Sequence, residues 1–153
     1  MRKLPYKVIG TYHPVEGATP KQIGHDLVKI VADAGYYPME GHGWDGATWH
    51  SPSTGSEVRR SYTQDSSSRR WHQDSNGMDV EMALWASQAP TQVRYKWGRK
   101  IYAPQPFEVV VVNNTSTKHK GPPAADCHGR LFFRQYVTTT PPEPEYDAEG
   151  LAS

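Results

Sequence analysis

The sequence DVEMALWAS at residues 79–87 decides the fold class of this chain. Its even-numbered residues, from Val80 to Ala86, are all apolar. Because side chains two residues apart leave an extended strand on the same side, they would form one apolar face. The odd-numbered residues form the other face, which begins with Asp79 and ends with Ser87. This period of two predicts a half-buried β-strand.

Segments on both sides of this stretch also have the composition of strands. Residues 107–112 include four consecutive valines and favour a strand buried on both faces. Residues 130–138 place two arginines, Arg130 and Arg134, on the same face as aromatic residues, and a buried arginine is costly unless it meets an anion. Further strands are predicted at residues 6–11, 57–64, 92–97 and 100–102, the last two joined by a hairpin turn.

One helix is expected near the N-terminus. Thr19 can cap it, Pro20 suits its first position and Gly35 can end it. The apolar residues between them recur at helical spacing: Ile23, Leu27, Ile30, Val31 and Ala34. One or two N-terminal helices followed by about eight short strands predict a mainly β chain, built as an antiparallel sandwich or jelly roll.

Length, charge and cysteine content narrow the class of protein. The 153 residues fit one domain, and we expect it to span residues 1–140, with its core at about 57–138 and an acidic, flexible tail at 141–153. The net charge of +1 gives no global field that would recruit nucleic acid or membrane. A single cysteine, no long apolar run and no signal-peptide core lead us to expect a cytoplasmic protein without membrane association.

The candidate chemistry centres on His72, Asp74 and His119. His72 and Asp74 lie two residues apart, so on a strand their side chains would share one face, and His119 follows a strongly strand-like run. Two imidazoles and one carboxylate with open coordination positions form the facial triad of non-haem Fe(II) oxygenases. The simpler alternative is a surface histidine beside a turn aspartate, because a chain with 7 histidines forms such a pattern by chance. Zinc is a further alternative, although no hydrolytic motif lies nearby.

Three stretches resemble the Fe(II)- and 2-oxoglutarate-dependent oxygenases, which fold as a double-stranded β-helix, a cupin-like jelly roll. The first is WHQD at residues 71–74, and the second is PFEVVVVNN at 106–114 leading to HKGP at 119–122. The third is the spacing of Arg130 and Arg134, 11 and 15 residues after His119, which is similar to the taurine-dioxygenase-like branch.

The resemblance implies a ligand set and a reaction. His72, Asp74 and His119 would hold Fe(II), and Arg130 would bind the distal carboxylate of the cosubstrate 2-oxoglutarate. Arg134 would lie nearer the metal, at the other end of the cosubstrate or at the substrate, which is a small molecule or a side chain. With O2 the enzyme would hydroxylate this substrate and release succinate and CO2. His128 competes with His119 as the distal ligand, and Arg134 competes with Arg130 as the main anchor.

Two other functions compete with this interpretation. The chain could be a non-catalytic jelly roll that acts as a binding or structural, virion-type protein. It could also be an oxygenase that acts on a nucleobase, because cations alternate with aromatic residues at 94–100 and an arginine cluster occupies 59–70. The near-neutral net charge argues against nucleic acid as the partner. A loop rich in tryptophan at 41–55 would either line the substrate entrance or pack as a lid.

Overall fold

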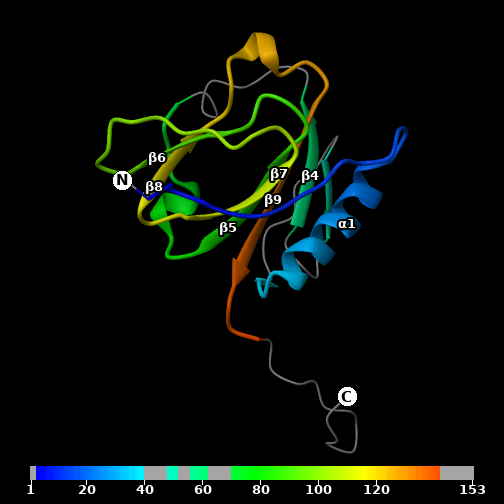
Figure 1. The fold of residues 1–153 in the computed structure, drawn as a ribbon, viewed down its shortest axis with the longest axis horizontal. Coiled ribbons are helices and arrows are strands. Elements are labelled where there is room, and N and C mark those ends of the chain that lie inside the picture. The colour runs from blue at the N-terminus through cyan, green and yellow to red at the C-terminus, as the bar shows by residue number, and fades with distance from the viewer. Residues whose placement is uncertain (1–2, 40–47, 52–55, 62–69, 142–153) are drawn as a thin grey trace, which may run out of the picture.

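The computed structural model describes residues 3–39, 48–51, 56–61 and 70–141 (Figure 1). The predicted tail at 141–153 lies outside this described part of the chain, apart from its first residue, and so does most of the tryptophan-rich loop. That the tail is flexible, and that the loop is an entrance or a lid, therefore stay predictions.

The described residues form one α-helix, two short 3-10 turns and nine strands. In chain order they are β1 (Lys7–Thr11), α1 (Pro20–Asp33), β2 (Tyr37–Pro38), β3 (Thr48–Ser51), β4 (Ser56–Ser61), η1 (Asp74–Gly77), β5 (Glu81–Ala86), β6 (Gln92–Tyr95), β7 (Glu108–Asn113), β8 (Thr117–Lys120), η2 (Ala124–Asp126) and β9 (Arg130–Thr138). The mainly β prediction is confirmed. None of the helices in this part of the chain has the length and apolar character needed to cross a membrane.

The strands form two antiparallel sheets. The large sheet has the order β1-β7-β5-β9-β4-β3, with β2 paired to β9, and the small sheet consists of β6 and β8. Single bridges extend the small sheet on both sides, because His72 pairs with His119 of β8 and Tyr102 pairs with Val93 of β6. The second bridge brings together the two segments predicted as a hairpin, but β6 ends at Tyr95 and residues 100–102 form this single bridge rather than a strand.

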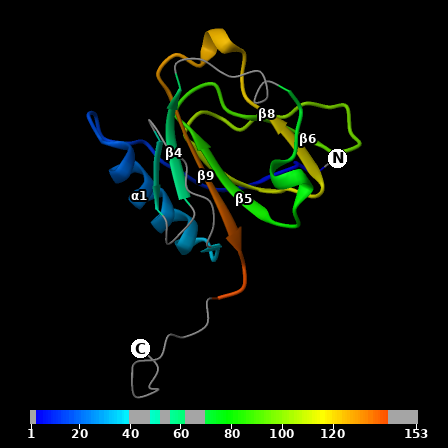
Figure 2. The same cartoon turned by 180° about the vertical axis from the view of Figure 1, so that it is seen from behind.

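The large sheet is covered on both faces. Helix α1 lies against one face, and the small sheet lies on the opposite side (Figures 1 and 2). The core on the helix side includes Leu27, Val31, Ala83, Trp85 and Phe133. The core on the small-sheet side comprises Val80, Met82, Leu84, Val93, Val110, Val112 and Tyr136. The molecule therefore has two hydrophobic cores separated by one sheet.

Strand β5 differs from its prediction. The alternation at residues 79–87 predicts a strand with one solvent-facing side, yet every residue from Met82 to Ala86 is buried. The reason is its place in the sheet: β5 pairs with both β7 and β9, and each of its faces points into one of the two cores. The polar residues that gave the alternation, Asp79, Glu81 and Ser87, lie only at the ends of the buried segment.

Helix α1 begins and ends where its capping residues predict. The Thr19 hydroxyl accepts a hydrogen bond from the Gln22 backbone N–H at 3.2 Å, and the Gln22 side chain accepts one from the Thr19 N–H at 2.8 Å. Both bonds use amide groups that a helix leaves unpaired at its first turn. Gly35 follows the C-cap with a φ of +90°, a conformation that favours glycine.

Packing of α1 against the sheet predicts that valine-to-alanine substitutions at a buried and at an exposed position change the stability by different amounts. Val31 is 0% exposed and Val15 is 77% exposed. Val31→Ala removes two methyl groups and should lower the free energy of unfolding by about 2 kcal/mol, because apolar burial is lost and a cavity remains. Val15→Ala should change it by less than about 0.5 kcal/mol. Urea unfolding followed by circular dichroism measures both, and equal effects would mean that α1 does not pack as described.

Candidate metal centre

Three side chains from two segments that are far apart in the sequence meet between the two sheets. His72, Asp74 and His119 each direct a ligand atom to one point, and these atoms all lie within 4.8 Å of one another. The distance from Asp74 Oδ1 to His72 Nε2 is 3.6 Å, and that to His119 Nε2 is 3.5 Å. The two imidazole rings have their centroids 4.4 Å apart. Among the described residues this is the one group with the composition and spacing of a metal site.

Backbone pairing brings the two histidines together. The N–H of His72 donates to the carbonyl of His119, and the N–H of His119 donates to the carbonyl of His72, both at 3.0 Å. Residues paired in this way across antiparallel strands have their side chains on the same face. In β8 the burial alternates, so that His119 points inward and Lys118 and Lys120 point outward. His72 must therefore point inward as well.

Asn114 fixes the turn that carries Asp74. This fully buried side chain accepts a hydrogen bond from the Asp74 N–H at 3.1 Å and donates to the carbonyls of Asp74 at 2.9 Å and Met78 at 2.8 Å. Its own backbone carbonyl accepts from the Gln73 side chain at 2.7 Å. The side-chain amide of Asn114 therefore holds both ends of η1, and it fixes the backbone position from which the Asp74 side chain extends.

The protonation of His72 is set by a backbone carbonyl. Its Nδ1 lies 2.7 Å from the carbonyl oxygen of Arg70, which can only accept a hydrogen bond, so Nδ1 carries the proton. The lone pair of Nε2 then faces Asp74 and is available for a metal ion. His119 differs, because its Nδ1 is buried and makes no hydrogen bond to the described residues.

Asp74 is held in its ionised form. Burial by itself raises the pKa of this carboxyl group, but hydrogen bonding and charge from His119, followed by those of Arg134, hold the pKa well below 3.8. Arg134 donates from a terminal guanidinium nitrogen to Asp74 Oδ2 at 2.9 Å. Because Arg134 occupies one carboxylate oxygen, the other, Oδ1, is left facing the two imidazoles.

The donor atoms fit a divalent metal ion. Two ligand atoms that are each about 2.1 Å from a shared ion lie about 3.0–3.4 Å apart at octahedral or tetrahedral angles. The observed 3.5 and 3.6 Å exceed this by a few tenths of an ångström, which small side-chain rotations can remove. Two neutral imidazoles and one carboxylate suit Fe(II) and also Zn(II). The cluster can therefore bind a metal ion, although the donor set alone does not select iron.

The two arginines of β9 have different surroundings. Arg134 contacts Asp74, whereas Arg130 is 2% exposed and turns towards the loop after β5. It donates to the carbonyls of Gln88 at 3.2 Å and Ala89 at 2.9 Å, and to the Thr91 hydroxyl at 2.9 Å. Burial lowers its pKa to about 10, so the group stays a cation at neutral pH. These hydrogen-bond partners are all neutral oxygens.

The structure also bears on the competing histidine and on residues that the sequence interpretation missed. His128 is exposed and is not part of the cluster, which contains His119 instead. The role of Asn114 in positioning Asp74 was missed, although Asn113-Asn114 at the end of a valine-rich strand gave a signal, since a buried asparagine needs several partners. The resemblance implied that Arg134 lies nearer the metal, and the structure pairs it with Asp74, although the ion pair itself was not predicted.

Comparison with known proteins finds no matching family model, no matching curated protein and no matching solved structure. The functional argument therefore depends on the geometry of the site and on the motifs quoted above.

Two neighbouring asparagines allow a matched test of the Asn114 contacts. Asn114→Ala should weaken Co(II) binding about 10- to 100-fold, as is typical when a residue that orients a metal ligand is lost. Asn113→Ala is the control, because the Asn113 side chain accepts bonds from Thr115 and Ser116 in its own turn and does not contact the cluster. The visible absorption of bound Co(II) measures affinity. Equal weakening in both variants would contradict the assignment of Asn114.

Proposed function

We propose that the chain is an Fe(II)- and 2-oxoglutarate-dependent dioxygenase that hydroxylates a small molecule or a side chain. The observation that carries the proposal is the meeting of His72, Asp74 and His119, whose ligand atoms lie within 4.8 Å of one another. This is the donor set of the facial triad, and it comes from the same residues that resemble the oxygenase motif. Bound there, Fe(II) with 2-oxoglutarate and O2 supplies the oxidation, which yields hydroxylated product, succinate and CO2.

The order of the strands supports a jelly-roll interpretation of the fold. Within the large sheet, β4, β9, β5 and β7 are consecutive neighbours, and on the other side the segment at His72, β8, β6 and the segment at Tyr102 are consecutive neighbours. A jelly roll consists of two facing antiparallel sheets between which the chain repeatedly crosses. The metal ligands would then lie at the inner surface of the smaller layer, which is where His119 points.

The charge of Arg130 supports a dicarboxylate cosubstrate. A buried cation whose hydrogen-bond partners are neutral oxygens lacks the compensation that an anion would give. The distal carboxylate of 2-oxoglutarate would supply this charge, and the planar guanidinium can bind it through two parallel hydrogen bonds. Thr91, which already accepts a bond from Arg130, offers a hydroxyl donor to the same carboxylate.

Binding of this cosubstrate requires side chains to move. The space beside Thr91 that is lined by described residues, among them Leu84 and Val93, has a volume of about 10 Å³. Such a space holds about one water molecule. A five-carbon dicarboxylate next to Arg130 would therefore displace part of the Arg130–loop contacts, and the loop at Gln88–Thr91 would adjust when it binds.

Each polar residue of the site then has a defined task. Arg70 fixes the His72 tautomer through its carbonyl, Arg134 leaves a single Asp74 oxygen for the metal, and Asn114 holds the turn between them. Met82, Leu84 and Tyr136 belong to the hydrophobic core on the small-sheet side of the large sheet, the side from which Arg134 reaches Asp74. These residues bind and orient, and none of them needs to act as a proton donor or acceptor.

The first test compares Asp74, the first residue of η1, with Asp79, which follows η1. Asp74→Ala should abolish iron-dependent formation of succinate from 2-oxoglutarate, because one ligand and the anchor of Arg134 are lost. Asp79→Ala removes an exposed carboxylate five residues away and should leave turnover unchanged. Succinate is measured under air with Fe(II) and ascorbate, and again with Zn(II) in place of iron. Turnover that survives in Asp74→Ala, or that is equal with Zn(II), would refute the iron centre.

The second test addresses the cosubstrate anchor. Arg130→Lys keeps the positive charge but cannot form two parallel bonds, so the KM for 2-oxoglutarate should rise about 10- to 100-fold while the affinity for Co(II) stays the same. Arg99→Lys is the control, because Arg99 is exposed. Kinetics at saturating Fe(II) measure this KM. If Arg134→Lys raised the KM and Arg130→Lys did not, the main anchor would be Arg134.

A further inference from the structure

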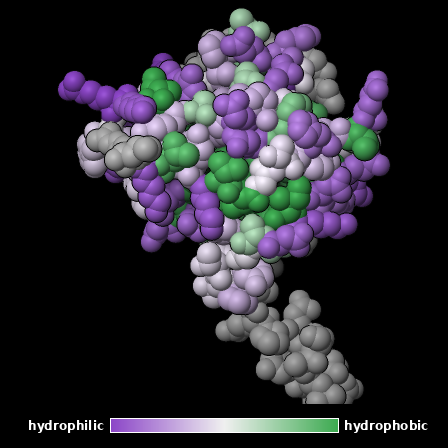
Figure 3. Space-filling view, viewed as in Figure 1, coloured by the Kyte–Doolittle hydropathy of each residue, from purple (hydrophilic) through white to green (hydrophobic). Residues whose placement is uncertain are grey.

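The outward side of the small sheet carries a concentration of positive charge. In the β6–β8 register Gln92 pairs with Lys120 and Arg94 pairs with Lys118, while Val93 and His119 point inward. Lys96, Arg99 and Lys100 continue from the end of β6, and the last two are exposed. Hydrophilic side chains extend into solvent from the left edge of Figure 3, the side on which β6 and β8 lie. We call these six cations the β6–β8 basic face.

This charge is not balanced locally. Residues 92–102 and 117–120 contain six lysines and arginines and no aspartate or glutamate, whereas the whole chain has 17 basic and 16 acidic residues. The six cations of the basic face form no ion pair with a carboxylate of the described residues. Six of the 17 basic residues of this near-neutral protein therefore lie in two segments that contain no acidic residue, and they create a local field for a polyanion.

Aromatic rings accompany these cations. The guanidinium of Arg94 lies 4.6 Å from the ring centre of Trp71, and the ammonium of Lys120 lies 5.1 Å from the same ring. Trp97 at the tip of the hairpin is 89% exposed, with the Lys96 ammonium 5.3 Å from its ring centre. An indole this exposed contributes little apolar burial to folding, and its flat face is available for stacking.

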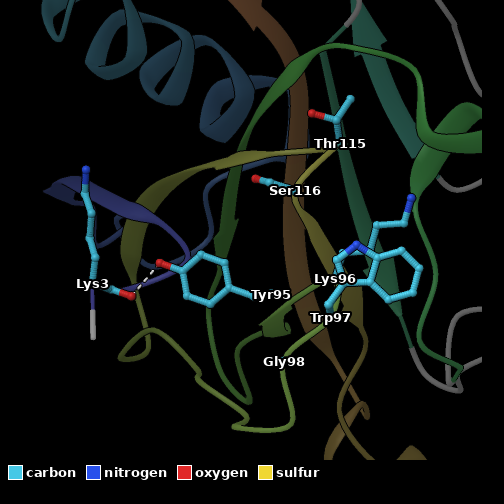
Figure 4. Close-up of a pocket in the computed structure, with 7 residues that line it drawn as sticks. All are labelled: Lys3, Tyr95, Lys96, Trp97, Gly98, Thr115 and Ser116. Carbon is cyan, nitrogen blue, oxygen red and sulfur yellow. Dashed lines mark hydrogen bonds between the residues drawn. The ribbon is translucent and has the colours of Figure 1, made fainter. Parts of the chain in front are cut away.

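A hollow beside Trp97 combines these groups. Its volume is about 580 Å³, and its lining consists of Lys3, Tyr95, Lys96, Trp97, Gly98, Thr115 and Ser116. Figure 4 shows Lys3 and Tyr95 on one side of it, Trp97 and Lys96 on the other, and the two hydroxyl residues between them. The volume is within the range of small-ligand sites, and the lining offers rings, ammonium groups and hydroxyl oxygens together.

We propose that the β6–β8 basic face and the Trp97 hollow bind single-stranded nucleic acid. The cations would contact successive phosphates, and Trp97 would stack on one base. The hydroxyls of Thr115 and Ser116 donate to Asn113, so their oxygens would accept hydrogen bonds from the same nucleotide. An acidic peptide would use the cations, but it would need an aromatic residue at the right position to stack on the exposed indole, whereas every nucleotide carries a flat base. A duplex keeps its base faces stacked inside the helix and could not use the indole either.

This surface is separate from the metal centre. The side chains of Lys118 and Lys120 leave β8 on the side opposite to His119, so the strand directs a candidate metal ligand inward and two cations outward. Binding should therefore need neither metal nor 2-oxoglutarate. The inference goes beyond the proposed oxygenase activity, and either one can fail without the other.

The experiment measures fluorescence anisotropy of a labelled 20-nucleotide oligothymidylate with the full chain in EDTA. Binding should weaken linearly with the logarithm of salt concentration. The double variant Lys96→Gln/Lys100→Gln should reduce the slope of log affinity against log salt by about 1.4, because each phosphate contact to a single strand contributes about 0.7. Trp97→Ala should weaken binding about tenfold or more, and Trp97→Phe should restore most of it.

A second double variant controls for net charge. Lys21→Gln/Lys29→Gln removes two exposed cations from α1 and should leave the affinity and the salt slope unchanged. Equal effects of the two double variants would overturn the proposal, as would absence of binding at 50 mM salt. Binding that is equally strong to the matching duplex, or that polyglutamate displaces with no effect of Trp97→Ala, would also overturn it in favour of a general polyanion surface.

Discussion

The exchange of two backbone hydrogen bonds between His72 and His119 is the interaction on which the rest of the candidate site depends. It joins a segment that has no other strand pairing to the edge of β8, and it places two imidazoles on the same face. Asn114 then ties the next turn, and with it Asp74, to the end of β7. Without this pairing the segment that carries His72 and Asp74 would be less fixed relative to His119 of β8, and its conformational entropy would oppose a common site.

The charged residues of the site differ in how well their charges are balanced. Asp74 is shared between a permanent cation, Arg134, and two titratable rings, so its negative charge is balanced even without a metal ion. Arg130, in contrast, is buried among neutral oxygens, which makes it the one cation of β9 for which an anion would be a net gain. The same strand therefore holds one arginine paired with a carboxylate and one whose hydrogen-bond partners are neutral oxygens. On the opposite side of the small sheet, Lys118 and Lys120 point outward.

Much of the architecture could be predicted from local patterns. The caps at Thr19, Pro20 and Gly35 bounded α1, the four valines marked a strand buried on both faces, and residues 130–138 formed a strand with the predicted limits. These predictions succeed because they depend on contacts within a few residues. The prediction that one face of β5 is exposed was wrong, because the burial of a strand depends on what packs over it. Strand β8 was not predicted, since its four residues Thr117–Lys120 are polar and pair only because the chain returns to β6.

The sequence alone determined the identity of the ligands: a histidine and an aspartate two residues apart, a distant histidine and two arginines at fixed spacing on one strand. It could do so because the chemistry of a donor belongs to its residue type. Only the tertiary structure decided that His119 rather than His128 joins the cluster, that Arg134 rather than Arg130 contacts Asp74, and that Asn114 supports the turn. Those choices depend on the register between strands that are about 40 to 60 residues apart, and register is set by packing of the whole sheet rather than by any local sequence.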